Sequence, residues 1–353
     1  MQAFARPLNP KPAGNWLQIQ SRRSQKISID NDFFVDIRGV SVQIFFKMNF
    51  QNALTIAATG LFISSVSASV TIDWVTVGNA GNTGDSATYN QMGAVGYVYQ
   101  IGKYEVTNAQ YSEFLNAKAT DDSYELYHIG MGINRDGNSG NYTYSVTEGY
   151  GNEPVAFVSW FDAARFSNWL ANGQGSGSTE TGSYTLNGAT SGIIYANESA
   201  KIRIPTESEW YKAAYYNGGT QTYSLYPNGL SIISTLQANY DPYFTTGERE
   251  NYVGRVTAVG TYSNNPSYYG TYDQGGNVRE WNDGDNGLGK GVRGGSWDDP
   301  ESEMANTALA YSLVTWEVDS MGFRLASVNP IPEPTASLLG VLGTTMFLRR
   351  RRK

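Results

Sequence analysis

The stretch Gly270–Trp281, GTYDQGGNVREW, gathers oxygen donors and glycines in one short loop. The carboxylates of Asp273 and Glu280 can supply charged oxygens. Glycines allow the backbone to curl, so that the carbonyls of Gly276 and Val278 can face the same centre. Donors of this kind bind hard cations such as calcium. The alternative is a glycine-rich turn that ends in a core tryptophan, because the spacing of an EF-hand loop is absent.

Cysteine is absent from all 353 residues, and His128 is the only histidine. The absence of cysteine excludes disulfides, cysteine-ligated metal sites and cysteine nucleophiles within the chain. A single histidine excludes a metal site built from several histidines. His128 lies in a Gly-rich stretch with no partner motif, so we interpret it as a loop residue.

The composition predicts many turns and aromatic packing. The chain holds 39 Gly, 25 Tyr and 8 Trp, and only 16% of its residues are charged. Basic residues outnumber acidic ones in residues 1–47 and 333–353, whereas the whole chain has a net charge of −7. The part in between is therefore strongly acidic, which argues against binding to nucleic acid.

The two ends carry segments that we interpret as sorting signals. Residues 48–68 begin at Met48 and place an apolar run before small residues, as a signal peptide does. Because a signal peptide begins a protein, we interpret residues 1–47 as an upstream mistranslated or extended leader. Near the other end, Pro332-Glu333-Pro334 precedes an apolar run and the basic residues 349–353.

The order of parts in residues 330–353 resembles the PEP-CTERM sorting signal of Gram-negative bacteria. The resemblance implies processing by an exosortase, with the secretion machinery as a partner, and a destination in the cell envelope or outside the cell. The apolar run is shorter than the roughly 20 residues of a stable membrane span, although the basic residues would hold its C-terminus in the cytoplasm. We expect membrane contact only through this segment. The alternative is a simple tail anchor.

Between these signals, residues 69–329 form the predicted folded body, with no repeat and no dividing linker. Alternation predicts a strand followed by a Gly/Asn turn within Ile72–Asp85, and a second strand at Tyr97–Val106. Helices are expected after Thr107, Ser159 and Thr206, where polar caps precede spaced apolar residues. Glycine, asparagine and tyrosine dominate from Asn217 onward, which predicts short strands and ordered loops.

Several runs resemble the formylglycine-generating enzyme, or sulfatase-modifying factor, domain family. They cover nearly all of the body and occur in family order: YEVTNAQYSEFLN, PVAFVSWFDAARFSNWL, RIPTESEWYKAA, GGNVREW, VRGGSW and GFRLA. The resemblance implies an α+β, loop-rich variant of the C-type-lectin fold that is braced by calcium. We expect Arg324 to pair with a buried carboxylate.

The resemblance implies two structural calcium sites. One falls on the side chains of Asp273 and Glu280 and the carbonyls of Gly276 and Val278, in agreement with the reading of the loop above. The other falls on further side chains and carbonyls, namely Asn239, Tyr240, Glu250 and Tyr252, and Glu250 stands there in place of a shorter acid.

The family's oxidase chemistry does not carry over. Its enzymes use a copper-bound cysteine pair shortly after the VRGGS run, and here Asp299 and Met304 stand near those positions. Copper(I) prefers thiolate ligands, so we expect no copper and no formylglycine-generating activity.

Three functions remain open. The first is a non-catalytic binding module for a polysaccharide or peptide, with Tyr272, Trp297, Asp299 and Trp316 as candidate ligand contacts. The second is an enzyme of other chemistry that uses the acidic residues Asp298, Asp299, Glu301 and Glu303 as acid, base or metal ligands. The third is a calcium-stabilised structural protein of an extracellular matrix.

Overall fold

The computed structural model describes residues 33–37, 40–44, 69–89 and 91–328. The chain divides into two units, Met1–Ser65 and Val66–Lys353. In the first unit, β1 (Phe33–Ile37) and β2 (Val40–Ile44) pair as an antiparallel hairpin. The predicted signal peptide, the C-terminal sorting signal and the rest of the leader lie outside the described residues, so these assignments stay predictions.

The body joins its two ends in one four-stranded sheet. The strand order is β3 (Trp74–Val77), β4 (Tyr99–Gly102), β14 (Ala326–Ser327) and β7 (Ile202–Arg203). The last described strand, β14, pairs with β4 from the start of the body and with β7 from its middle. All pairings in this sheet are antiparallel. The first and last strands of the body thus both pair with β4, which lies between them.

A second sheet comes from the C-terminal third. Its order is β12 (Ala310–Ser312), β11 (Lys290–Arg293), β10 (Arg279–Asp285) and β13 (Met321–Gly322), with β10 and β13 parallel. Two small hairpins complete the strands: β5 (Ile133–Asp136) with β6 (Thr143–Val146), and β8 (Tyr216–Asn217) with β9 (Thr222–Tyr223). These short strands confirm the predicted loop-rich α+β character of this half.

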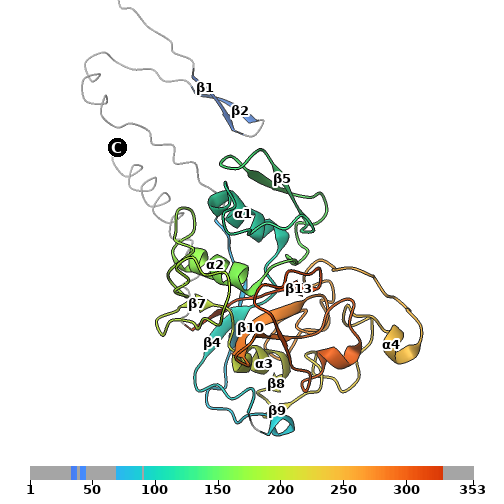
Figure 1. Ribbon diagram of the computed structural model, residues 1–353. Coiled ribbons are helices and arrows are strands. Elements are labelled where there is room, and N and C mark those ends of the chain that lie inside the picture. Colours follow the sequence, from blue (N-terminus) through green and yellow to red (C-terminus); the bar gives the residue numbers. More distant parts are fainter. Residues whose placement is uncertain (1–32, 38–39, 45–68, 90, 329–353) are drawn as a thin grey trace, which may run out of the picture. The chain divides into compact units, whose positions relative to one another are not determined.

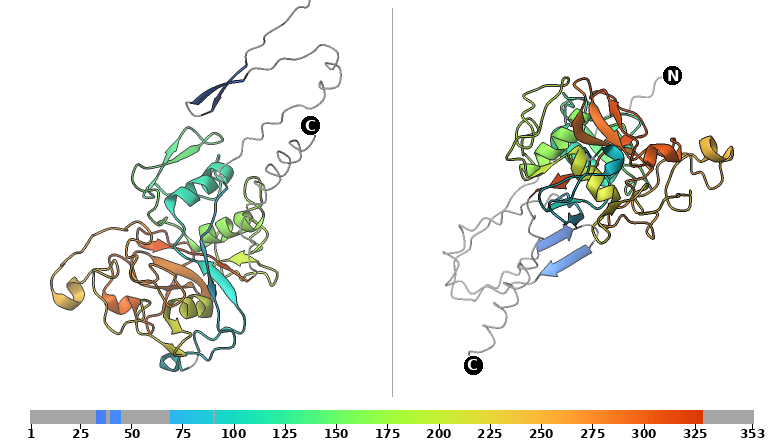
Figure 2. Two further views of the ribbon diagram at one scale, coloured as in Figure 1. Left: turned by 180° about the vertical axis from the view of Figure 1, so that it is seen from behind. Right: turned by 90° about the horizontal axis from the view of Figure 1, so that it is seen from below.

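The three predicted helices are confirmed as α1 (Asn108–Lys118), α2 (Trp160–Ala171) and α3 (Glu207–Tyr215). Each begins with a reciprocal capping box, in which the cap and the third helical residue exchange side-chain hydrogen bonds with each other's backbone. Shorter turns are α4 (Tyr243–Thr246) and the 3-10 helices η2 (Ser86–Thr88) and η3 (Glu301–Met304). Figures 1 and 2 show α4 projecting on a long loop.

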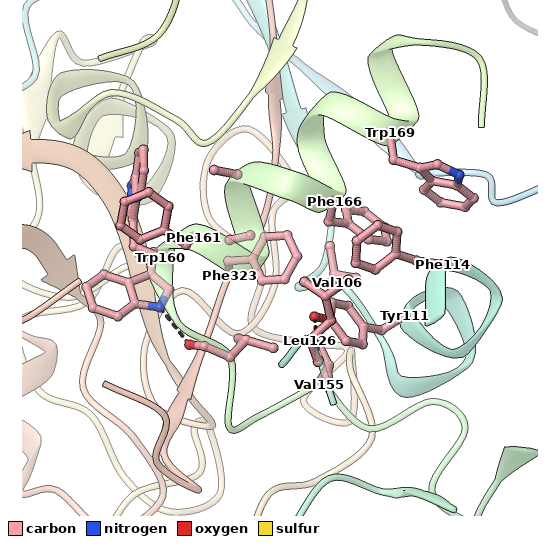
Figure 3. Packing of buried hydrophobic residues seen from close by; sticks show 14 of the residues in the cluster. Val106, Tyr111, Phe114, Leu126, Val155, Trp160, Phe161, Phe166, Trp169 and Phe323 are labelled. Carbon is pink, nitrogen blue, oxygen red and sulfur yellow. Dashed lines mark hydrogen bonds between the residues drawn. The ribbon is translucent and has the colours of Figure 1, made fainter. Parts of the chain in front are cut away.

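The largest core is aromatic and surrounds α2, whose residues are buried from Trp160 to Leu170. Phe166 lies against Phe114 of α1 and against Phe323, with ring centroids 5.4 Å and 5.5 Å away (Figure 3). The hydroxyl of Tyr111, in the same core, donates to Leu126 O at 3.0 Å (Figure 3). This core fixes α1 and α2 against the chain's last strands.

Within the described ranges, the helices are all too short and too polar to span a bilayer.

The cap of α2 predicts a pH dependence of stability. The Asp162 carboxylate accepts from Ser159 N at 2.8 Å and Ser159 Oγ at 2.6 Å, but burial raises its pKa to about 7. The folded protein therefore holds this proton over a range in which the unfolded chain, with a pKa near 4, has lost it. The stability from this group is full below about pH 4 and is lost as the pH rises toward 7.

We expect Asp162→Asn, which keeps an acceptor for Ser159, to reduce the decline in unfolding free energy between pH 4.5 and 7.5 by about 2 kcal/mol. Urea unfolding at the two pH values measures this decline. The exposed Asp136→Asn is the matched control and should leave it unchanged. An unaltered decline in Asp162→Asn would contradict the account.

Candidate functional site

A buried ion pair between Arg324 and Glu280 lies at the centre of the second half of the body. Arg324 follows β13, which pairs with β10 so that Gly322 lies beside Glu280. Its Nε and Nη2 donate to the two carboxylate oxygens of Glu280, each at 2.6 Å, and neither side chain is exposed. The indole Nε1 of Trp210 in α3 also donates to Glu280, at 2.8 Å. The expected buried carboxylate partner of Arg324 is thus Glu280.

This pairing competes with the predicted role of Glu280 as a calcium ligand. Its Oε1 accepts one hydrogen bond and its Oε2 two, so the carboxylate is already paired in charge with Arg324. Val278 is fully buried, and Gly276 N donates to Gly294 O at 2.8 Å. A Cβ at Gly276 would lie 2.2 Å from Asn239 O, so the glycine is needed for a close backbone approach. Across the described residues, no three Asp, Glu or His side chains group as a metal site.

Two further carboxylates surround the same guanidinium. Asp273 adopts a left-handed backbone with φ of 57°, and its Oδ2 accepts from Gly260 N at 2.6 Å. Burial raises the pKa of Asp273 to about 6, although the Gly260 hydrogen bond and Arg324 oppose that rise. Glu105 accepts from Asn277 Nδ2 at 3.2 Å, and its Oε2 lies 3.9 Å from Arg324 Nη2. Arg324 thus supplies the positive charge for three buried acids.

The second predicted calcium site fits in part. Asn239 Nδ2 donates to Arg255 O at 2.9 Å and to Asn277 Oδ1 at 3.2 Å, which leaves its buried Oδ1 without a donor. An unpartnered buried oxygen is what a cation ligand requires. Tyr240 is buried, whereas the Glu250 side chain is exposed and Tyr252 packs on the Arg249 guanidinium at 4.9 Å. Calcium here stays a prediction that rests on Asn239.

The candidate ligand contacts do not form one surface. The Tyr272 ring stacks on Tyr104 at 5.4 Å, with Lys103 Nζ over both rings. Trp316 is 51% exposed. Trp297 lines a pocket whose lining does not include Tyr272, Asp299 or Trp316. The four candidates therefore do not share this pocket, and their ligand contacts stay predictions.

The Trp297 pocket has a volume of about 240 Å³ and is formed by loops around the start of α1 and the start of α2. Its walls combine aromatic rings with a few polar groups. The polar and aromatic residues in its lining include Asn108, Tyr150, Glu153, Phe157, Arg255, Trp297 and Asp319. Sequence reasoning missed Asn108, Glu153 and Phe157, since each stands in a stretch that also has a structural explanation as a helix cap or strand end.

Phe157 is held in a strained backbone conformation at the pocket. Its φ of 57° is in the left-handed region, which is costly for an aromatic residue and is concentrated at functional sites. Its ring stacks on His128 at 4.5 Å, and His128 Nδ1 accepts from Gly130 N at 3.0 Å. A Cβ at Gly130 would lie 2.5 Å from the Phe157 ring, so the glycine makes room for it. The lone histidine is indeed a loop residue, and it supports the pocket wall.

Comparison with known proteins now gives the family. Residues 74–328 match the family described as the sulfatase-modifying factor enzyme 1-like domain. The chain belongs to this family. Its body has the family's fold, an α+β and loop-rich one, as the resemblance in the sequence implied, and it lacks cysteine throughout.

The chain is also similar to known structures and to curated relatives. Treponema denticola variable protein 1 is 22% identical and has a TM-score of 0.50, over 74% of this chain and 97% of that one. PvdO from Pseudomonas aeruginosa is 18% identical with a TM-score of 0.45, over 72% and 94%. The serine/threonine-protein kinase pkn1 of Chlamydia caviae is 28% identical over 180 residues, which are 50% of this chain. The chain spans about a fifth of that relative's length.

In this member of the family, the two positions expected for catalytic cysteines have structural partners. The Asp299 carboxylate is held by the Arg279 guanidinium and accepts from Ser296 Oγ at 2.6 Å. Met304 is fully buried in a cluster with Tyr226, Ile233 and Tyr240. Asp298 is exposed and accepts from the Tyr252 hydroxyl at 3.3 Å. These contacts do not favour the alternative of an acid, base or metal site in this acidic run.

The buried ion pair predicts the outcome of removing its acid. Glu280→Ala leaves the Arg324 charge buried without its main partner, which should lower the free energy of unfolding by about 3–5 kcal/mol. Because the loss concerns Arg324 and not calcium, it should be the same with and without a chelator. Denaturant unfolding measures it, with the exposed Glu248→Ala as control. A loss below about 1 kcal/mol, or one that vanishes with chelator, would contradict this assignment.

Proposed function

We propose that this protein is a non-catalytic binding module that holds a ligand in the Trp297 pocket. The main observation behind the proposal is that neighbouring residues of one segment differ: some make structural contacts, whereas Trp297 lines a pocket. Asp299 and Met304, near the positions expected for the family's reacting cysteines, take part in an ion pair and in the core, respectively. Trp297, two residues before Asp299, remains in a pocket with aromatic walls and polar groups. Such a pocket suits binding without chemistry.

The binding module would act outside the cytoplasm. The signal peptide proposed for residues 48–68 and the sorting signal proposed for residues 330–353 support export through the secretion machinery and processing by an exosortase. The destination that we propose is the envelope or the extracellular matrix of a Gram-negative bacterium. The acidic composition of the body is compatible with a soluble exported domain.

Calcium would brace the loop that carries Asn239, where the unpartnered Oδ1 and the Tyr240 carbonyl are the proposed ligands. Support comes from the position of this loop: Asn239 forms a parallel bridge to Gly276, and its Nδ2 bonds the Arg255 carbonyl next to the pocket. A cation there would hold the Arg255 segment in place and so support the pocket wall.

The binding proposal predicts different roles for two tryptophans. Purified full-length protein should bind a polysaccharide or peptide saturably, without converting it. Trp297→Ala should weaken binding about tenfold or more, because it removes one aromatic wall of the pocket. Trp316→Ala, a matched change at an exposed tryptophan, should leave affinity unchanged. Calorimetric titration against ligand arrays measures both. The proposal would be contradicted if Trp297→Ala and Trp316→Ala bound the ligand with equal affinity, or if the protein converted the ligand.

The calcium proposal predicts a metal-dependent melting temperature. A chelator should lower the Tm of the parent, and Asn239→Ala should lower the Tm in calcium while making it insensitive to chelator. The exposed Asn138→Ala serves as control and should behave as the parent. Scanning calorimetry, together with metal analysis for stoichiometric calcium, measures these effects. If the Tm of the parent changes with neither calcium nor chelator, the proposed calcium site at Asn239 is wrong.

A further inference from the structure

Two residues that line the Trp297 pocket each carry a fully buried acceptor oxygen with no hydrogen-bond donor. The oxygens are Oδ1 of Asn108 and Oε2 of Glu153, which belong to residues only 2% and 5% exposed. Buried acceptors in folded proteins nearly always have a donor, and one without it is costly. A ligand that brings donors to this place would satisfy both.

The orientation of the Asn108 amide is fixed by its neighbours. Its Nδ2 donates to three backbone carbonyls, those of Tyr150 at 3.1 Å, Glu153 at 3.3 Å and Pro154 at 3.4 Å. Carbonyls only accept, so the opposite amide orientation would place oxygen against oxygen. The Asn108 atom without a partner is therefore the acceptor Oδ1.

Glu153 offers the second acceptor, and this one carries charge. Its Oε1 accepts from Arg255 Nη1 at 2.6 Å, while its Oε2 has no partner. The Arg255 side chain is 59% exposed, so water competes for its charge. Asp319 adds another carboxylate to the lining. Two carboxylates against one guanidinium leave the pocket negative and suited to a cation.

The rest of the lining is apolar or aromatic. Phe157 and Trp297 provide rings, and Pro154, Ala156 and Val256 provide aliphatic surface. Aromatic faces attract cations and also pack against alkyl chains. A sugar ring carries hydroxyls around its edge, and these would lose water without gaining partners on such walls. An alkyl chain that ends in a charged donor suits this combination.

We propose that the pocket binds the protonated primary amine at the end of an aminoalkyl chain, as in the lysine side chain of a polypeptide. The ammonium donates to Glu153 Oε2 and Asn108 Oδ1, and the methylenes lie between Phe157 and Trp297. The volume of about 240 Å³ suits one side chain better than a whole oligomer. This inference rests on the proposed binding function and specifies the ligand's chemistry.

The test compares two probes that differ only in charge and donors, Nα-acetyl-lysine methylamide and Nα-acetyl-norleucine methylamide, titrated into the full-length protein at pH 7. Tryptophan fluorescence or calorimetry reports binding. We expect the lysine probe to bind at least tenfold more tightly, since charged hydrogen bonds are made only by the ammonium. Equal affinity of the two probes would overturn the inference, and this comparison requires no variant.

Variants then locate the effect. Glu153→Gln keeps the shape but removes the charge, and it should reduce the preference for lysine over norleucine about tenfold. Glu148→Gln, the same change at an exposed glutamate, should keep the preference. Melting curves check that each variant is folded. An undiminished preference in folded Glu153→Gln would overturn the inference.

Three other outcomes distinguish failure of this inference from failure of the proposed function. Tighter binding of glucosamine than of the lysine probe would assign the pocket to an amino sugar and overturn the polypeptide assignment. If neither amine binds, yet Trp297→Ala still weakens binding of some other ligand, the inference fails and the proposed function stands. If no ligand on the arrays binds at all, the proposed function fails with it.

Discussion

The buried contact between Arg324 and Glu280 is the constraint on which the second half of the fold depends. A guanidinium without solvent must be paired and fully hydrogen-bonded, or the fold loses several kcal/mol. Arg324 meets this condition with Glu280 and with the carbonyls of Gly102, Lys103 and Tyr272. These partners come from distant parts of the sequence. One side chain therefore ties loops together in a region that has little regular secondary structure of its own.

The pocket also depends on contacts between segments that are distant in sequence. Asn108 stands at the start of α1 because Thr107 caps that helix, and its amide then binds the carbonyls of the segment that also carries Glu153. Phe157 occupies a strained backbone position just before α2, which the large aromatic core holds in place. Strain and unpartnered acceptors are both costs that the folded core must outweigh. Their coincidence at one pocket is the physical basis of the proposed binding function.

Sequence reasoning was strongest where local rules act. The capping boxes at Thr107, Ser159 and Thr206 determine where three helices begin, and the family's runs identified the fold. It was weakest where the partner is distant in sequence. The carboxylate of Glu280 has the chemistry of a calcium ligand, and only the fold shows that Arg324 already occupies it. Likewise, no local pattern separates Trp297, in a pocket, from Trp316, on the surface.

The most direct test of the central claim, a pocket retained while the family's reacting positions became structural, is a crystal structure of the protein with the lysine probe bound. The account predicts density for the aminoalkyl chain beside Trp297, with its nitrogen within hydrogen-bonding distance of Glu153, and Asp299 still paired with Arg279. Density at Asp299 with that pair broken, and an empty pocket beside Trp297, would contradict it.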